Sequence, residues 1–390
     1  MLNSIEIQFI KDHQQEDVSK LAFQKKKYPL LDLPKLLFQI QARQKLKAKL
    51  PTWVNNDQIF FPPQISLEQS SSEKTALFKA KLIFGKIIDL TGGMGLDSWA
   101  FAQEKTNEVT YVEINETLKE ISQYNHQVFG LEQIKHFHAD GMKYLKNESH
   151  NFDWIYLDPA RRDKTGKKVF LLKDCTPDAT QILPYINEHT NLLVKVSPML
   201  DIDLCIKELK GVDEVHIVCV QNEVKELLFK KTKKSSLNPL INVWELQNSE
   251  QLLFSQTKQT ELETSSEISS ISTYLYEPHA GILKAGFFKS IQSAGVFKLA
   301  SNTHLYTSEK IISNFPGKKY QVLATGKLDL NWIKAYIKDN RANISCRNFP
   351  LKPEEIRKKL KLSDGGNITL FAYRDQNNLP ILSICQKNDF

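Results

Sequence analysis

Three glycines and two acids lie close together in the segment IIDLTGGMGLD, residues 87–97. The apolar run KIIDL ends just before the glycines, and LDSWAFAQEK, which has the texture of a helix, follows them. This order predicts a strand-to-helix turn at the carboxyl edge of a parallel sheet, where open α/β sheets bind ligands. One glycine suffices for a tight turn, so three within four positions favour a turn that a ligand approaches closely. The residues assigned to this ligand turn are Asp89, Thr91, Gly92, Gly93, Gly95 and Asp97.

The charges at the turn distinguish two kinds of nucleotide ligand. A dinucleotide-binding turn reads GxGxxG, and its helix begins against a pyrophosphate. Here Gly93-x-Gly95 is followed by Ser98, and Asp97 is expected at the start of the helix. A carboxylate in this place disfavours an anionic pyrophosphate but accommodates a ligand with an ammonium and a sulfonium group, such as S-adenosylmethionine. Asp89 is then expected to bind the amino group, directly or through water.

Acids also end the next three expected strands. Glu113 ends TYVEI and is expected to accept hydrogen bonds from both ribose hydroxyls. Dinucleotide-binding enzymes also have an acid in this place, so Glu113 alone does not distinguish the two ligands. Asp140 follows the third strand in HADGM, where it can accept the adenine amino group while Gly141 lets the ring lie close. Asp158 ends the fourth strand in YLDPARRD. One such acid is usually a helix cap or a solvated edge residue, but four in succession on one edge predict a binding site.

The elements that must position these residues are strands alternating with helices. Short apolar runs at 86–90, 109–114, 134–140, 152–158, 191–197 and 214–220 are separated by connections of helix length. This pattern predicts βαβ units and a parallel sheet. The fold class is therefore α/β, with a Rossmann-like domain at 85–230.

The flanking regions have different textures. Residues 1–84 are expected to be a helical region, with helices at 32–50 and 70–84, the second opened by a Ser70–Glu73 capping box. The Pro-rich stretch 51–64 is expected to be a loop. Residues 231–270 are expected to be a polar connection containing a strand or two. Residues 271–390 are expected to form a small α+β region that ends in the order β-α-β-α-β-β.

The motifs DLTGGMG, YVEIN, HADG and YLDPARR resemble those of class I S-adenosylmethionine-dependent methyltransferases, over about residues 70–230. A wider resemblance covers nearly the whole chain. EQSSSEKTALFKAKL running into DLTGGMGLD, NEVKELLF, and the stretch at 347–367 are similar to a bacterial group of these enzymes with a ferredoxin-like and THUMP-like C-terminal domain. DLTGGMGLDSWAFA also resembles the corresponding turn of a ribosomal RNA guanine-N2 methyltransferase.

The resemblance implies a role for each matching residue. Asp89, Gly93 and Gly95 would hold the methionine part of S-adenosylmethionine, Glu113 the ribose and Asp140 the adenine.

Two positions depart from the family pattern. Thr91 stands where the commoner GxGxG turn has its first glycine. By the resemblance, Asp158 and Pro159 lie where the methyl group and the target atom meet. The next residues are Ala160 and Arg161, whereas amine-methylating enzymes have an aromatic residue there that stacks on a flipped base. Base stacking must then come from elsewhere or from the plane of an arginine.

Methyl transfer from a sulfonium is an in-line displacement, which alignment alone can accelerate strongly. Asp158 or the carbonyl of Pro159 could accept a hydrogen bond from an exocyclic amine. Arg161 and Arg162 could bind a phosphate or carboxylate of the substrate, or form a salt bridge on a solvated loop.

Other chemistry has weaker support. Cys219 lies in an apolar strand and is expected to be a buried structural thiol, and no histidine lies near Cys175 in the sequence. His126, His136 and His138 are expected to face solvent or to pack, with no metal site. The cysteines form no CxxC pair, which favours a reducing cytoplasm, and no run of about 18 apolar residues predicts a membrane span.

The sequence thus predicts a cytoplasmic S-adenosylmethionine-dependent methyltransferase that acts on RNA, ribosomal or transfer, at a base nitrogen. The net charge of +7 slightly favours a polyanionic partner. Basic residues of the C-terminal helix around 352–361 are either a solvated face or a phosphate-binding surface. The alternatives are a methyltransferase of a small molecule or protein, and a non-catalytic RNA-binding or assembly factor that keeps the cofactor pocket.

Overall fold

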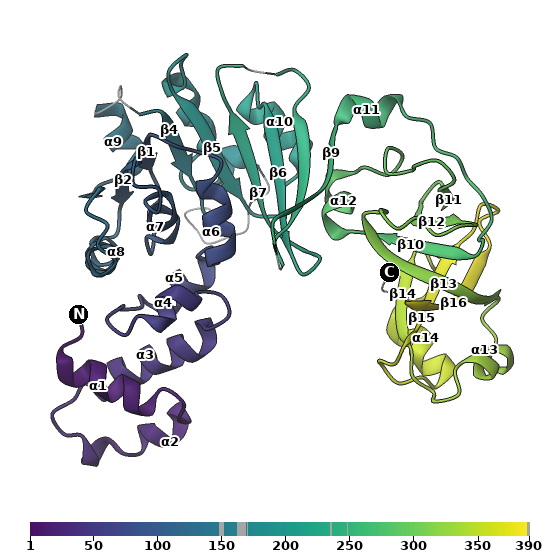
Figure 1. Ribbon diagram of the computed structural model, residues 1–390, viewed down its shortest axis with the longest axis horizontal. Helices are drawn as coiled ribbons and strands as arrows, with labels where there is room; N and C mark the ends of the chain where they lie inside the picture. The colour runs from purple at the N-terminus through teal and green to yellow at the C-terminus, as the bar shows by residue number, and fades with distance from the viewer. Residues whose placement is uncertain (148–151, 162–168, 170, 235, 248, 388–390) are drawn as a thin grey trace. The chain divides into compact units, whose positions relative to one another are not determined.

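The computed structural model describes residues 1–147, 152–161, 169, 171–234, 236–247 and 249–387 (Figure 1). The chain forms two compact units. The first comprises residues 1–215 and 226–237, and the second comprises residues 216–225 and 238–390. Within the described residues, no helix is both long enough and apolar enough to cross a membrane.

A largely parallel sheet forms the centre of the first unit. Its strands are β1 (Lys86–Asp89), β2 (Glu108–Glu113), β3 (Ile134–His138), β4 (Trp154–Leu157), β5 (Asn191–Val196) and β7 (Glu223–Lys231), which belongs to this unit from Glu226 onward. They lie in the order β3-β2-β1-β4-β5-β7, and every pair is parallel except the antiparallel pair β5–β7. The α/β fold class and the strand positions predicted from the sequence are confirmed.

The strand order places a ligand-binding crevice at one point of this sheet. The chain runs outward from β1 to β3 and then returns to β4 on the other side of β1. A crevice opens at such a reversal, beyond the carboxyl ends of the two central strands. The connecting helices are α7 (Leu96–Phe101), α8 (Glu116–Val128), α9 (Gly141–Asn147), α10 (Ile202–Leu209) and the 3-10 helices η2 (Leu172–Asp174) and η3 (Ala179–Tyr185).

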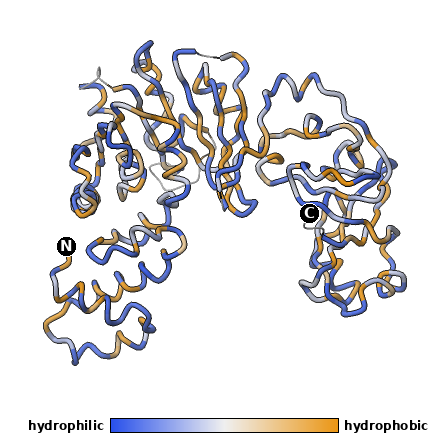
Figure 2. The backbone as a smooth tube through the Cα atoms, in the orientation of Figure 1, coloured by the Kyte–Doolittle hydropathy of each residue, from blue (hydrophilic) through white to orange (hydrophobic). Residues whose placement is uncertain are grey.

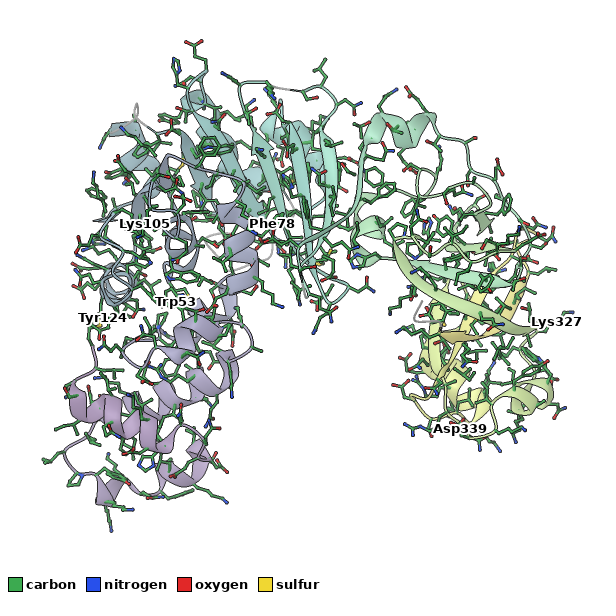
Figure 3. The ribbon with its side chains drawn as sticks, viewed as in Figure 1. Trp53, Phe78, Lys105, Tyr124, Lys327 and Asp339 are labelled. Carbon is green, nitrogen blue, oxygen red and sulfur yellow. The ribbon has the colours of Figure 1, made fainter. Side chains whose placement is uncertain are left out.

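A helical region precedes the sheet. Its helices are α1 (Ser4–His13), α2 (Val18–Ala22), the 3-10 helix η1 (Lys25–Lys27), α3 (Leu33–Leu46), α4 (Pro51–Asn55), α5 (Gln64–Gln69) and α6 (Glu73–Ala80). Trp53 of α4 is fully buried and packs against Trp99 of α7 and Phe129, with ring centroids 6.1 and 5.4 Å away (Figure 3). Because this core includes residues of both parts, the helical region is fixed against the sheet domain and positions α5 beside the glycine turn.

Two local predictions for this region are wrong. The capping box lies at Ser72, whose side chain accepts from the N–H of Thr75, and not at Ser70. Ser70 instead ends α5, and its hydroxyl donates to the carbonyl of Leu67. The stretch 51–64, expected to be a loop, begins with α4, because Pro51 occupies the first turn, where a helix needs no proline N–H.

The second unit holds the C-terminal half of the chain. Strand β6 (Glu214–Val220) begins in the first unit and belongs to the second from His216 onward. The other elements are β8 (Leu240–Glu245), β9 (Gln251–Thr257), α11 (Lys258–Glu263), β10 (Tyr274–Pro278), α12 (Ala280–Ala285), β11 (Phe297–Ala300), β12 (Thr303–Ser308), β13 (Gly317–Gly326), α13 (Leu330–Tyr336), β14 (Asn343–Arg347), α14 (Pro353–Leu360), β15 (Ile368–Arg374) and β16 (Pro380–Lys387). A sheet in the order β11-β12-β10-β13-β16-β15-β14 runs through this unit. From β13 onward the elements follow the predicted β-α-β-α-β-β order, and hydrophobic residues recur along the strands (Figure 2).

Candidate functional site

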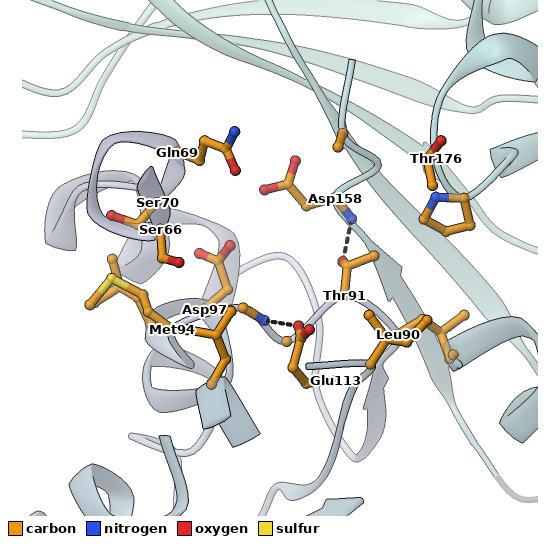
Figure 4. Close-up of a pocket in the computed structure, with 18 of the residues that line it drawn as sticks. Ser66, Gln69, Ser70, Leu90, Thr91, Met94, Asp97, Glu113, Asp158 and Thr176 are labelled. Carbon is orange, nitrogen blue, oxygen red and sulfur yellow. Dashed lines mark hydrogen bonds between the residues drawn. The ribbon is translucent and has the colours of Figure 1, made fainter. Parts of the chain in front are cut away.

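A cavity of about 360 Å³ lies in the first unit, at the carboxyl ends of β1, β2 and β4 (Figure 4). Its position is the crevice that the strand order predicts. The residues that line it are Ser66, Gln69, Ser70, Ser71, Leu90, Thr91, Gly92, Gly93, Met94, Leu96, Asp97, Glu113, Ile114, Leu118, Asp140, Gly141, Asp158, Ala160, Thr176 and Pro177.

The glycines of the turn are required by backbone conformation and by space. Gly93 and Gly95 have φ of 56° and 82°, which disfavours other residues. A Cβ on Gly92 would lie 2.2 Å from the ring of Tyr111, and one on Gly141 would lie 2.3 Å from the carbonyl oxygen of Leu90. A side chain at Gly92 or Gly141 would therefore collide with these neighbours, so the close packing requires glycine at both positions.

The carbonyl groups of the turn are anchored on the side away from the cavity. The hydroxyls of Tyr111 and Ser122 donate to the carbonyl of Gly93, at 2.6 and 3.1 Å. The carbonyl of Gly95 lies 2.8 Å from Nε2 of the buried His126. A side chain of β2 and two of α8 thus hold the backbone of the turn in one conformation.

A second histidine completes this anchor. Nε2 of His136 lies 2.7 Å from Nδ1 of His126. Because a carbonyl only accepts, Nε2–H of His126 must donate to Gly95, so its Nδ1 accepts from Nε2–H of His136. Burial lowers the pKa of His126 to about 3 and that of His136 to about 4, with the neighbouring ring and Lys119 adding to the effect. The packing role expected for these two histidines is confirmed, and both rings are neutral near pH 7.

Glu113 and Asp140 both line the cavity, and both also hold backbone groups. One oxygen of Glu113 accepts from the N–H of Gly93 at 2.7 Å, and the other accepts from the N–H of Asn115 at 2.8 Å. Oδ1 of Asp140 accepts from the N–H of Lys143 at the start of α9. Each carboxylate oxygen has two acceptor sites, so these bonds still allow a ligand hydroxyl or amino group to bind.

Asp89 lies behind the turn and does not line the cavity. It is 1% exposed, and its oxygens accept from the hydroxyl of Ser98 at 2.8 Å and the N–H of Thr91 at 3.1 Å. Burial raises its pKa to about 7, with a contribution from Asp97 and against the effect of these hydrogen bonds. Its binding of a ligand amino group stays a prediction, and this geometry favours an indirect contact.

Asp97, at the start of α7, joins the cavity to a buried ion-pair cluster. Its Oδ2 accepts from the hydroxyls of Tyr156 at 2.7 Å and Ser71 at 3.1 Å, and its Oδ1 lies 3.2 Å from Nζ of Lys79. Lys79 is fully buried and donates to both oxygens of Glu226 at 3.0 Å. Burial raises the pKa of Asp97, but the nearby lysines lower it further, so the net pKa lies below the ordinary value and the carboxylate is ionised.

Asp158 lines the opposite wall and is held at two points. Its N–H donates to the hydroxyl of Thr91 at 2.8 Å, and its Oδ2 is paired with Nζ of Lys195 on β5. Burial lowers the pKa of Lys195, but Asp158, Glu226 and Asp97 raise it more, so this lysine is a cation. The hydroxyl of Thr91 therefore links the turn after β1 to the end of β4. A glycine in this position has no side chain that could accept this hydrogen bond.

Three other residues predicted for the site do not line the cavity, and a fourth lies outside the described residues. Pro159, Arg161 and Gly95 do not line the cavity, although Ala160 does, and its backbone exchanges two hydrogen bonds with Thr176. Arg162 lies outside the described residues.

Sequence reasoning missed twelve of the cavity residues, and six of these come from segments that it did not assign to the site. Ser66, Gln69, Ser70 and Ser71 come from α5 and the segment after it, and Figure 4 shows Ser66, Gln69 and Ser70 across the cavity from Thr91 and Thr176. Thr176 and Pro177 come from a loop far along the chain. The serine run before α6 is the only sequence signal for these segments, and serines in this position are typical of a helix cap.

The lining fits a ligand that is part cationic and part nucleoside. Four carboxylates line the cavity: Asp97, Glu113, Asp140 and Asp158. No lysine or arginine is among the described residues that line it, although Lys79 and Lys195 lie behind Asp97 and Asp158. Leucines, Ile114 and Met94 supply apolar contacts for a flat ring. In the described part of the chain, the cavity included, no group of three or more His, Cys, Asp and Glu residues could hold a metal ion.

Comparisons with known proteins agree with this description. A ferredoxin-like domain model matches residues 274–316, and a THUMP domain-like model matches residues 317–387. An uncharacterized RNA methyltransferase of Mycoplasma mobile is 36% identical over 76 residues, which are 20% of this chain and 21% of that protein. The match thus spans about a fifth of that curated relative.

One crystal structure matches the chain over its whole length. It is the structure of a Porphyromonas gingivalis W83 protein assigned as a methyltransferase. The two chains are 30% identical, each covers 100% of the other, and the TM-score is 0.87. The chain therefore belongs to the family of this protein, the class I methyltransferases with a ferredoxin-like and THUMP-like C-terminal region.

Proposed function

We propose that this methyltransferase uses S-adenosylmethionine and modifies RNA, ribosomal or transfer, at a base nitrogen. The observation that carries the proposal is the cavity at the reversal of strand order. It brings the glycine turn together with Glu113, Asp140, Asp97 and Asp158.

The chemistry of the cavity supports S-adenosylmethionine. Glu113 ends β2 and can accept ribose hydroxyls, and Asp140 at the start of α9 can accept the adenine amino group next to Gly141. Asp97 and Asp158 add negative charge where an ammonium and a sulfonium would lie. When bound, S-adenosylmethionine supplies an electrophilic methyl group.

The residues of the chain would align and desolvate the acceptor. Figure 4 shows the Asp158 carboxylate projecting into the cavity, where it could accept a hydrogen bond from the N–H of an exocyclic amine. Lys195 and the Thr91 hydroxyl hold Asp158 in place, so little motion is needed when the acceptor arrives. No aromatic side chain is among the described residues that line the cavity, so base stacking must come from another part of the protein.

RNA is the substrate that the comparisons favour. The C-terminal region matches a THUMP domain-like model, and the Mycoplasma mobile relative is named as an RNA methyltransferase. The net charge of +7 is compatible with a polyanion. We place the reaction in the cytoplasm, because all five cysteines are free thiols, four of them buried.

The direct test is methyl transfer by the purified protein. S-adenosylmethionine with a tritiated methyl group is incubated with separate RNA, protein and small-molecule fractions of a bacterial lysate. We expect ribonuclease-sensitive label in the RNA fraction, and a strongly reduced initial rate of labelling with an Asp158→Asn variant. Label in another fraction would identify a different substrate class, and tight cofactor binding without any transfer would favour a non-catalytic RNA-binding or assembly factor.

A further inference from the structure

A basic segment with exposed apolar side chains lies at one end of the helical region. Residues 18–31, VSKLAFQKKKYPLL, contain four lysines and no acid. Lys20, Lys25, Lys26 and Lys27 are all exposed. We call this segment, α2 and η1 with the residues up to Leu31, the basic tip.

The acids that flank the basic tip, Asp17 and Asp32, cap helices, and with both included the four lysines still leave an excess of two positive charges. Asp17 accepts from the N–H of Ser19 at the start of α2, and Asp32 accepts from the N–H of Lys35 at the start of α3. The helical region as a whole also carries an excess of positive charge. Residues 1–84 contain thirteen of the chain's 52 lysines and arginines but only eight of its 45 acids.

Two large apolar side chains beside the lysines take no part in the core. Phe23 is 91% exposed and Leu30 is 96% exposed, whereas Leu21 is fully buried in the core of the helical region. Tyr28 packs edge-on against Phe9, and Nζ of Lys27 lies 5.6 Å from the Tyr28 ring. Singly exposed apolar residues are common on protein surfaces, but here an aromatic ring and a leucine, both almost wholly in water, adjoin a run of lysines.

The basic tip lies away from the cavity within the same unit. Figure 1 shows α2 at the end of the helical region farther from the sheet, and α5 and α6 at the end next to it. The connecting helix α3 has 14 residues, a length of about 21 Å at 1.5 Å per residue. A ligand that touches both the basic tip and the cavity must therefore be a polymer, not a single nucleotide.

We propose that the basic tip is a docking surface for RNA, on which the lysines contact phosphates and Phe23 stacks on an unpaired base. Lysines beside an exposed aromatic are the combination with which proteins hold single-stranded nucleic acid. The proposal rests on the proposed function and deepens it: the substrate becomes a structured RNA with an unpaired segment, bound by the helical region as well as by the C-terminal region.

An anionic membrane also attracts lysines, but the structure favours RNA. Helices that lie in a membrane surface present a broad apolar face, and α2 has five residues. The two exposed apolar residues come from the end of α2 and from a loop, so they do not form such a face.

The test compares three variants of the full-length protein. Lys25→Ala/Lys26→Ala/Lys27→Ala removes the lysine run. Phe23→Ala removes the exposed ring. Lys105→Ala/Lys135→Ala/Lys207→Ala removes three exposed lysines from other elements of the same unit and is the matched charge control (Figure 3 labels Lys105). Binding to fragmented ribosomal RNA is measured by fluorescence anisotropy over a series of salt concentrations.

The two parts of the basic tip should respond differently. Loss of three phosphate contacts should make the fall of log affinity with log salt less steep, by about 2 units of slope. The affinity itself should fall at least tenfold. Phe23→Ala should weaken binding about fivefold or more while leaving the slope unchanged, because stacking releases no counterions. The matched control should bind as the wild type does.

Several outcomes would overturn the proposal. One is equal losses in the lysine-run variant and the matched control, which would indicate only a general charge effect. Another is unchanged RNA binding together with lost binding to phosphatidylserine vesicles, which would assign the basic tip to membranes. Titration of S-adenosylmethionine into the same variants separates this proposal from the proposed function. Normal cofactor binding with unaltered RNA binding contradicts the docking surface alone, whereas a wild type that binds no cofactor contradicts the function.

Discussion

At the residue scale, Glu113 links the cavity to the backbone of the glycine turn. Its two oxygens hold the N–H groups of Gly93 and Asn115 and also face the expected ribose. Glu113→Ala should weaken S-adenosylmethionine binding about 10- to 100-fold, the equivalent of one or two lost hydrogen bonds to a charged group. Isothermal titration calorimetry measures this change, with Glu120→Ala on exposed α8 surface as the control. Equal affinities for all three proteins would refute the ribose assignment.

Asp158 should affect turnover and not cofactor affinity. It lies opposite α5, where the acceptor would approach, and Lys195 pairs with it from β5. Asp158→Asn should lower the methyl-transfer rate about 100-fold, the lower end of the range for a lost proton acceptor. Cofactor affinity by calorimetry should change less than about threefold. A variant that transfers methyl groups at the wild-type rate would show that Asp158 does not contact the acceptor.

Burial of Asp89 predicts that binding of a cationic cofactor is coupled to proton release. Its pKa is raised to about 7 by burial, so near neutral pH a part of the molecules carries a protonated carboxyl group. A cation bound in front of the turn should lower this pKa and release up to about half a proton at pH 7. The release is measured by calorimetry in buffers of different ionisation enthalpy. S-adenosylhomocysteine, which lacks the sulfonium charge, should release fewer protons, and equal release for both ligands would contradict this account.

At the scale of elements, α8 holds the glycine turn through a neutral histidine. The ordinary histidine pKa of 6.5 falls to about 3 in buried His126, which faces His136 and Tyr111. Between these two values the unfolded chain binds more protons than the folded one. The free energy of unfolding should therefore fall as the pH falls below 6.5, by about 1.4 kcal/mol per pH unit from His126 alone.

Chemical denaturation of the wild type and a His126→Gln variant between pH 7 and 4.5 measures this contribution. The wild type should lose stability more steeply than the variant. Asp89, whose pKa is raised, contributes a slope of the opposite sign, but it does so in both proteins and cancels in the difference. Identical slopes would show that the His126 ring is not held neutral.

The sequence predicted the elements whose signal is local. The strands β1 to β6 and the glycine turn were recognisable because apolar runs, glycines and strand-end acids lie within a few residues of one another. The wall formed by α5, Thr176 and Pro177 was not, because it depends on packing between distant segments, such as Trp53 against Trp99. Asp89 shows the same limit: its place at the strand end was predictable, but its burial behind the turn depends on Ser98 and the surrounding core.

At the scale of the whole molecule, two basic surfaces lie in different units. The basic tip is in the first unit, and α14 with Lys358, Lys359 and Lys361 is in the second. If both contact one RNA at separate phosphates, their contributions to the binding free energy should add. A variant that combines Lys25→Ala/Lys26→Ala/Lys27→Ala with Lys358→Ala/Lys359→Ala/Lys361→Ala should show the summed losses within about 0.5 kcal/mol. A combined variant no weaker than either parent would show that only one surface engages the RNA.

We propose that this cavity methylates a base of RNA in the cell. The most direct measurement is mass-spectrometric profiling of the nucleosides of ribosomal and transfer RNA. Cells without the protein are compared with cells that produce the wild type or Asp158→Asn. We predict that one methylated base is present with the wild type and is absent or strongly reduced in the other two strains. Identical nucleoside profiles in all three strains would contradict the account.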